Sequence, residues 1–461
     1  MNIEELKNSL LAAPKNGYAR LSAQERIGME NHAKGYAAFI DACKTEREAV
    51  TWSVQMLKDH GFVELVPGME LKPGDKVYRN VHNKSMMAAV IGSESLNDGA
   101  RICAAHIDSP RMDLKPNPLY EDAGMAYLKT HYYGGIKKYQ WVTVPLALHG
   151  VVVRKDGSSV TITIGEDEND PILMITDLLP HLAADQMQKT AGAVIAGEQL
   201  NVLLGSEPLE GEGSDLVKLH MMKLLNDKYG IIEEDFLSAE LSIVPAMKCR
   251  EVGLDRSMLG AYGHDDRVCA YNQFVPLLDL GTPRHTAVCL WADKEEIGSV
   301  GVTGMQSFAF ETFIQDLCLG TGASLYRCFE NSFCLSADVS NAYDPNFGET
   351  CDKRNNSAMN MGVAIFKYTG SRGKGGCSDA SAEVMSHIRT TFEKNNVIWQ
   401  SATLGAVDVG GGGTVAADMA NRNIPTVDAG VPVLSMHAPM ELVSKLDCYE
   451  TMLACKAIYL A

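Results

Sequence analysis

The sequence predicts an α/β protein in which a mostly parallel central sheet is flanked by helices and interrupted by a second, β-rich domain. Beyond residue 255, apolar strand-like runs alternate with helical patterns, as is typical of a parallel sheet. The first hundred residues read as capped helices followed by strands, whereas residues 109–250 hold short strand-like runs between acidic loops. We therefore expect a main domain made of residues 1–108 and 251–461, with residues 109–250 inserted into it.

Two helices near the N-terminus are predicted from their capping residues. Ser22 and Glu25 have capping-box spacing at the start of one helical pattern, and Thr45 and Glu48 repeat it at the next. Gly61 follows the second pattern where a helix stop is expected. The strand-like runs "KVYRNVH", "SMMAAVIGS" and "RICAA" come next.

In the inserted segment, "LALHGVVVRKDGSSVTITIG" reads as a β-hairpin that turns at Lys155, Asp156 and Gly157. The acidic loops "GEDENDP" and "GSEPLEGEGSD" interrupt the strands on its C-terminal side. We expect a β-rich domain here.

Composition excludes several classes of protein. The 461 residues carry a formal net charge of -17 without a Lys/Arg-rich run, which argues against nucleic acid or an anionic membrane as partner. No apolar run is long enough to span a bilayer, and the N-terminus is acidic where a signal peptide is basic, so we expect a cytoplasmic protein. Cys103, Cys289 and Cys334 lie in apolar runs and are interpreted as core residues.

Polar side chains follow several of the strand-like runs. "RICAA" leads into His106 and Asp108, "AVCLW" into Asp293, Glu295 and Glu296, "SFCLSA" into Asp338, and "VPVLSM" into His437. Because open α/β sheets form their binding crevice at the carboxyl ends of the strands, we expect these side chains to converge.

Two further carboxylates, Asp265 and Asp266, precede a helical pattern and are expected at a helix N-terminus. Oxygen and nitrogen ligands without a thiolate suit a pair of zinc-like divalent ions. Such ions also explain the adjacent Glu295 and Glu296, which would otherwise repel one another. One glutamate can bind metal while the other transfers protons.

With these residues in place, the sequence resembles the aspartyl aminopeptidases, cytosolic dinuclear zinc metallopeptidases that remove N-terminal residues from peptides. The match spans nearly the whole chain and rests on "AAHIDSP", "YYGGI", "PHLA", "GHDDRV", "DKEEIGS", "SADVSNA", "GGGGT" and "MHAP", in the family's order. The resemblance implies a zinc aminopeptidase-like fold and two divalent ions, with Zn²⁺ expected and Co²⁺ or Mn²⁺ as alternatives. It also implies a homo-oligomer, a closed dodecamer in that family. Because the texture of the sequence changes between His106 and Asp265, we expect residues 109–250 to build subunit contacts.

The resemblance assigns roles residue by residue. Asp265 would bridge the two ions, with Asp266 as its rival, and Glu295 would be the general base. Asp108 would orient an imidazole ligand. The implied metal ligands are His106, Asp265, Glu296, Asp338 and His437.

Substrate contacts are also implied. In the family, the histidine corresponding to His181 of "PHLA" reaches into a neighbouring subunit's active site. Arg372 or Lys374 would meet an acidic N-terminal side chain of the substrate, although the spacing in "YTGSRGKGGCSDAS" departs from the family pattern. Peptidase activity is therefore more firmly implied than a preference for Asp or Glu.

Two other functions stay open at this point. Deacylation of small N-acyl compounds uses similar metal chemistry, and a non-catalytic peptide-holding or assembly protein could keep the fold. The presence of Glu295 and of all five implied metal ligands argues against a non-catalytic protein. The glycine-rich segment 408–420 lacks the Lys-Ser/Thr pair of a phosphate loop, so we expect it to let the backbone approach the substrate.

Overall fold

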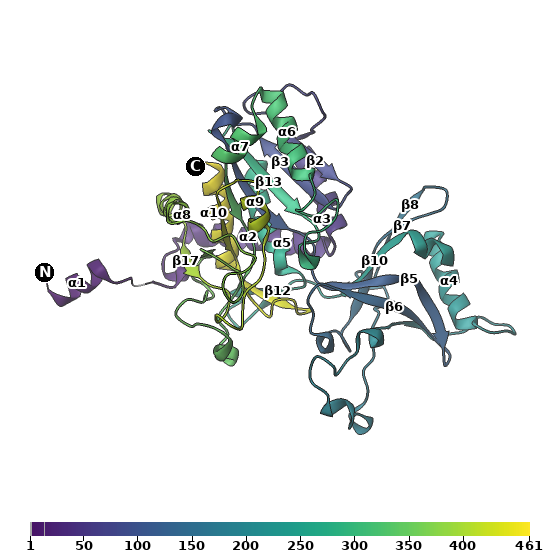
Figure 1. Ribbon diagram of the computed structural model, residues 1–461. Coiled ribbons are helices and arrows are strands. Elements are labelled where there is room, and N and C mark those ends of the chain that lie inside the picture. Colours follow the sequence, from purple (N-terminus) through teal and green to yellow (C-terminus); the bar gives the residue numbers. More distant parts are fainter. Residues whose placement is uncertain (1, 13) are drawn as a thin grey trace.

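The computed structural model describes residues 2–12 and 14–461, which form two lobes (Figure 1). The main lobe is built on a nine-stranded sheet with the order β1-β2-β3-β13-β4-β14-β18-β16-β17. Its strands are β1 (Val63–Glu64), β2 (Lys76–Val81), β3 (Ser85–Val90), β4 (Ala100–His106), β13 (Thr286–Ala292), β14 (Phe333–Ser336), β16 (Val363–Phe366), β17 (Trp399–Ala402) and β18 (Thr426–Gly430). The four middle strands, β13, β4, β14 and β18, are parallel to one another. Their carboxyl ends therefore meet at one edge.

Helices cover both faces of this sheet. One face packs against α2 (Ala23–Ala42), α3 (Glu46–Asp59), α5 (His264–Leu278), α8 (Ala382–Lys394) and α10 (Lys445–Tyr459). The other packs against α6 (Ala309–Thr321), α7 (Leu325–Asn331) and α9 (Val415–Ala420). Successive side chains of a strand point to opposite faces, so Cys103 joins the first core and Ile102 the second. Burial on both faces explains why these strands read as continuous apolar runs.

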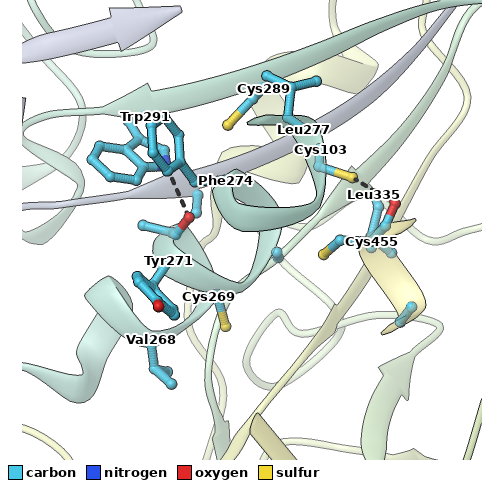
Figure 2. Packing of buried hydrophobic residues seen from close by; sticks show 14 of the residues in the cluster. Cys103, Val268, Cys269, Tyr271, Phe274, Leu277, Cys289, Trp291, Leu335 and Cys455 are labelled. Carbon is cyan, nitrogen blue, oxygen red and sulfur yellow. Dashed lines mark hydrogen bonds between the residues drawn. The ribbon is translucent and has the colours of Figure 1, made fainter. Parts of the chain in front are cut away.

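Figure 2 shows how α5 lies on the sheet. Phe274 packs against Trp291 of β13, and the Trp291 indole N–H donates to the Ala270 carbonyl at 2.9 Å. Cys103, Cys289 and Cys334 are fully buried, which confirms their interpretation as core residues. This packing fixes the start of α5, where Asp265 and Asp266 lie, beside the carboxyl ends of the parallel strands.

The second lobe is a six-stranded antiparallel sheet with the order β8-β7-β10-β5-β6-β9, on the right in Figure 1. Its elements are β5 (Arg111–Asp122), β6 (Met125–Tyr133), β7 (Leu146–Val153), β8 (Ser159–Ile164), β9 (Val202–Gly205), β10 (Ala239–Pro245) and the helix α4 (Leu216–Tyr229). A separate hydrophobic core joins sheet and helix. The predicted hairpin is confirmed as β7 paired with β8.

A third, five-stranded sheet lies near the junction of the lobes and holds β11 (Arg250–Val252), β12 (Met258–Ala261), β15 (Ser340–Asn341), β19 (Pro432–Leu434) and β20 (Glu441–Ser444). His437 follows β19 of this small sheet, not a strand of the central sheet as the sequence had suggested. The reason is that β18 ends at Gly430, after which the chain immediately enters β19.

The predicted fold class is confirmed: a mostly parallel sheet flanked by helices, with a β-rich second unit. Both predicted capping boxes are present, at the starts of α2 and α3. The short helix α1 (Ile3–Leu10) has only exposed residues and projects from the main lobe in Figure 1. Within the described ranges, none of the helices is both long and apolar enough to cross a bilayer.

Candidate metal centre

Two histidines face the same carboxylate at the edge of the central sheet. His106 Nε2 lies 3.1 Å from Asp265 Oδ1, and His437 Nε2 lies 3.0 Å from Asp265 Oδ2. Ligand atoms about 2.0–2.1 Å from a tetrahedral zinc ion are separated by similar distances. Asp265 therefore presents one oxygen to each side of the cluster.

The adjacent glutamates point to different histidines. After β13 ends, Lys294 adopts a left-handed conformation (φ 68°), and Glu295 and Glu296 begin a short 3₁₀ turn. Glu296 Oε1 lies 3.4 Å from His437 Nε2, whereas Glu295 Oε2 lies 3.9 Å from His106 Nε2. The turn thus separates the two carboxylates that the sequence places side by side.

Asp338 completes the cluster from the segment after β14, with Oδ1 4.0 Å from His106 Nε2. Within the described residues, two groups have ligand atoms close enough to share an ion: His106 with Asp265 and Glu296, and His106 with Asp266 and Asp338. His437 is in neither group and joins the cluster through its contacts with Asp265 and Glu296. The five residues predicted as ligands thus lie together, with Asp266 beside them.

Asp108 contacts both His106 and the turn that carries the two glutamates. Its carboxylate lies 3.3 Å from His106 Nδ1 and accepts the backbone N–H groups of Glu295 and Glu296, each at 3.2 Å. His106 Nδ1 also lies 3.0 Å from the Asp108 carbonyl oxygen. Burial alone would raise the pKa of Asp108, but its contacts with His106 outweigh burial and lower it. An ionised Asp108 thus links His106, at the end of β4, to the turn that carries Glu295 and Glu296.

The carboxylates of the cluster are largely buried. Burial raises the pKa of Glu295 to about 7, and it raises the pKa of Glu296 and Asp338 well above their ordinary values. Burial lowers the pKa of His437, but the contact with Asp265 outweighs it and raises this pKa to about 10. Divalent cations in the cluster would stabilise the ionised carboxylates and take the place of the imidazole protons.

The cavity over these side chains has a volume of about 220 Å³. Of the side chains described around it, none is a lysine or arginine that could neutralise the carboxylates. The buried Glu296 Oε1 has no hydrogen-bond partner among the described residues. Nitrogen and oxygen donors, clustered negative charge and an unsatisfied buried oxygen together fit divalent metal ions.

Three supporting residues were missed by sequence reasoning. Glu441, at the start of β20, accepts the backbone N–H groups of Asp265 at 3.1 Å and of His437 at 2.7 Å. The second lobe contributes Tyr133, whose hydroxyl donates to Asp108 Oδ2 at 2.8 Å, and Gly135, whose carbonyl lies 2.7 Å from His437 Nδ1. Tyr133 and Gly135 lie in the motif "YYGGI", but no role for them followed from the sequence, and Glu441 is marked only as an acidic residue at the start of a strand.

The residues predicted to contact substrate are not in this cluster. His181 lies on an exposed 3₁₀ turn of the second lobe and is not among the residues around the cavity. Arg372 and Lys374 line a second cavity of about 470 Å³, which shares Thr369 and Leu404 with the first. Lys374 Nζ is bonded to Asp379 at 2.9 Å and lies 4.0 Å from the centre of the Tyr368 ring.

The glycine-rich segment lies beside the candidate metal centre. Gly411, Gly412 and Gly413 line the cavity with the metal-ligating groups. A side chain at Gly411 would come within 2.4 Å of the Ser371 backbone, and its φ of 127° also favours glycine. The loop can therefore pass against Ser371 only because residue 411 is glycine.

Comparison with known protein sequences also indicates a zinc metalloprotease. A profile of the aminopeptidase I zinc metalloprotease (M18) family matches residues 39–459. A probable M18 family aminopeptidase 1 from Clostridium acetobutylicum is 48% identical over 455 residues, covering 97% of this chain and 98% of the relative. The corresponding protein of Thermotoga maritima is 42% identical over 438 residues, covering 93% and 96%.

Solved structures lead to the same family. The crystal structure of an M18 family aminopeptidase from Thermotoga maritima has a TM-score of 0.93 at 40% identity, covering 97% of this chain and 99% of that one. That of aminopeptidase I from Clostridium acetobutylicum has a TM-score of 0.91 at 44% identity, covering 98% and 100%. The S. cerevisiae mApe1 dodecamer, at 19% identity over 93% of this chain and 97% of that one, has a TM-score of 0.74, a likeness of fold alone.

The α/β fold and the cluster of histidines and carboxylates thus define a metallopeptidase. More narrowly, the chain belongs to the aminopeptidase I zinc metalloprotease (M18) family and is an aminopeptidase, a hydrolase. The family predicted from the sequence motifs is confirmed.

Proposed function

We propose that this aminopeptidase binds two divalent ions through His106, Asp265, Glu296, Asp338 and His437, and that Glu295 is its general base. The observation that carries the proposal is the position of Asp265, whose two oxygens face different histidines at 3.1 and 3.0 Å. A carboxylate in that position can bridge two ions, with His106 and Asp338 on one side and His437 and Glu296 on the other. Zinc is the expected metal, and cobalt or manganese would suit the same donors.

Such ions supply the Lewis acidity that lowers the pKa of a water molecule and polarises a peptide carbonyl. The chain's own residues handle the protons. The backbone N–H of Glu295 donates to Asp108, so its carboxylate is held at the cavity, and Glu295 belongs to neither of the two groups whose ligand atoms are close enough to share an ion. It takes a proton from the attacking water and gives it to the amine of the leaving peptide.

The lining of the cavity favours an uncharged N-terminal side chain. Val339, Phe366, Leu404 and Met436 form its apolar wall. Lys374 is already paired with Asp379, so Arg372 in the adjoining cavity is left as the candidate to meet an acidic side chain. We therefore propose short peptides with an apolar N-terminal residue as the main substrates.

We further propose that the protein works in the cytoplasm as a homo-oligomer, with twelve subunits as in the yeast relative of the same fold. Large apolar side chains are exposed on the loop of the second lobe that follows β8, namely Ile172, Met174, Leu178, Leu179, Leu182 and Met187. His181 lies in the same loop, where a neighbouring subunit's site could be reached from it.

The proposal is tested by two substitutions in the glutamate turn. Glu295→Gln keeps the shape of the side chain but cannot accept a proton, so it should lower kcat by roughly 10² to 10⁴ while metal content is nearly unchanged. Glu296→Gln should instead lower metal content. Metal analysis is read beside steady-state kinetics on aminoacyl substrates, with N-acetylated substrates to detect deacylation. Near-normal turnover of Glu295→Gln, or loss of metal by that variant alone, would contradict the division of roles.

A further inference from the structure

We propose that Tyr133, at the end of β6 in the second lobe, is a positioning residue for the metal centre. Its hydroxyl holds the carboxylate of Asp108, and the turn that follows it holds His437. This inference rests on the proposed function, because it concerns the geometry of the proposed metal ligands. Positioning here means that Tyr133 acts through Asp108 and does not contact metal or substrate.

Asp108 depends on a small number of donors. The Tyr133 hydroxyl donates to Oδ2 at 2.8 Å, and the backbone N–H groups of Glu295 and Glu296 donate to Oδ1 and Oδ2, each at 3.2 Å. The side chain of Asp108 is 0% exposed, so water cannot replace a lost donor without rearrangement. Because the phenol makes the shortest of these bonds, its loss would let the carboxylate move away from His106.

Tyr133 is itself fixed by charged side chains that cross between the lobes. The Arg111 guanidinium lies 4.2 Å from the centre of the Tyr133 ring, and Arg111 pairs with Tyr133 across β5 and β6. Arg111 donates to Glu46 of α3 at 2.9 Å and to Asp113 at 2.8 Å, and both Arg111 and Glu46 are buried. The phenol therefore has little freedom to turn away from Asp108.

The next two residues reach the other side of the cluster. Gly134 has a φ of 73°, and a Cβ there would lie 3.3 Å from both Cβ and Oε2 of Glu296. The Gly135 carbonyl lies 2.7 Å from His437 Nδ1, so it can accept the proton of that nitrogen and leave Nε2 free for a metal ion. Tyr133 and Gly135 of the second lobe thus support the two histidines of the proposed site, while Gly134 between them lies close to Glu296.

The test measures zinc affinity as well as activity. Tyr133→Phe removes the hydroxyl but keeps the ring against Arg111, and Tyr132→Phe, at an exposed neighbouring tyrosine, is the matched control. Full-length proteins are stripped of metal and titrated with zinc against a colorimetric chelator, and kcat and the Tm of the zinc-free protein are measured in parallel. We expect Tyr133→Phe to weaken zinc affinity or lower kcat about 10- to 100-fold, with the zinc-free Tm nearly unchanged.

An Asp108→Asn background separates positioning from general packing. If Tyr133 acts through Asp108, Tyr133→Phe should change zinc affinity much less in that background than in the wild type. The proposal is overturned if zinc affinity and kcat match those of Tyr132→Phe, if only the zinc-free Tm falls or the variant does not fold, or if the effect is equal in both backgrounds. Failure of the proposed function would appear differently, as a wild-type protein that binds no zinc or a fully active Glu295→Gln.

Discussion

Asp265 lies between the two histidines of the proposed metal site. It contacts both histidines, whereas Asp266 lies deeper, with Oδ2 3.4 Å from the backbone nitrogen of His106. These contacts favour Asp265 as the bridge.

Asparagine substitutions separate the two aspartates. Asp265→Asn should lose metal and lower kcat/KM by at least about 10²-fold, because the bridging charge is removed. Asp266→Asn should keep two ions, since an amide oxygen can still accept the His106 N–H. Metal analysis of both variants checks this. The opposite result, with metal retained in Asp265→Asn and lost in Asp266→Asn, would make Asp266 the bridge.

Arg372 offers a test of substrate preference. We expect wild-type kcat/KM to be higher for leucyl than for aspartyl or glutamyl substrates, because the cavity wall is apolar. Arg372→Ala should leave leucyl turnover nearly unchanged and lower any activity on acidic substrates by about 10-fold, equivalent to about 1.4 kcal/mol. Lys374→Ala is the control, since Lys374 is already paired. Acidic substrates turned over faster than leucyl ones by the wild type would contradict this account.

At the scale of residues, the sequence indicated those side chains that are proposed to bind metal or transfer protons themselves. Apolar runs precede His106, Glu295, Glu296, Asp338 and His437, and a charge after a buried strand is conspicuous. Asp265 was marked instead by its place before a helical pattern. Tyr133 acts through Asp108, 25 positions away, and Glu441 joins the backbone of His437, 4 positions away, to that of Asp265, 176 positions away. Such contacts are set by tertiary packing, and no local pattern predicts them.

At the scale of elements, His149 of β7 joins the second lobe to α3. Its Nδ1 lies 2.7 Å from Glu48 Oε1 of α3, and its Nε2 lies 3.1 Å from Glu166 Oε1, which also faces Lys44 at 3.7 Å. Lys248 pairs with Glu166 at 2.7 Å. Burial alone would lower the pKa of His149, but its contacts with Glu166 and Glu48 outweigh burial and raise it.

This raised pKa predicts a pH-dependent contribution to stability. The pKa of His149 is higher in the folded than in the unfolded protein, where it is about 6.5. The stabilisation is therefore fully present below that pH and is lost as pH rises through the folded value. His149→Gln should lower the Tm more at pH 6 than at pH 9.5. His82→Gln, at an exposed histidine, is the control, and an equal loss for His149→Gln at both pH values would contradict the ion pairs.

Elements differed in how well the sequence predicted them. The capped helices and the buried parallel strands were predictable because local caps and apolar runs coincide with the final packing. The small third sheet was not, since β19 lies only two residues after β18 and nothing in "IPTVDAGVPVL" marks a change of sheet. That change places His437 against one oxygen of Asp265, while His106 faces the other.

At the scale of the whole molecule, the exposed apolar loop of the second lobe is the surface expected to join subunits. Leu182 is 68% and Met187 76% exposed. A Leu182→Asp/Met187→Asp double variant should have a lower mass by light scattering than the wild type, because charge in an apolar interface is costly. Leu319→Asp, at an exposed leucine of α6, is the control. An unchanged mass for the double variant would exclude this loop from assembly.

The central claim, a two-metal site bridged by Asp265, is tested most directly by anomalous diffraction from crystals of the zinc-loaded protein, measured on both sides of the zinc absorption edge. We predict two zinc peaks in each subunit, with Asp265 between them, His106 and Asp338 on one ion, and His437 and Glu296 on the other. A single peak, a bridge made by Asp266, or zinc remote from His437 would contradict the account.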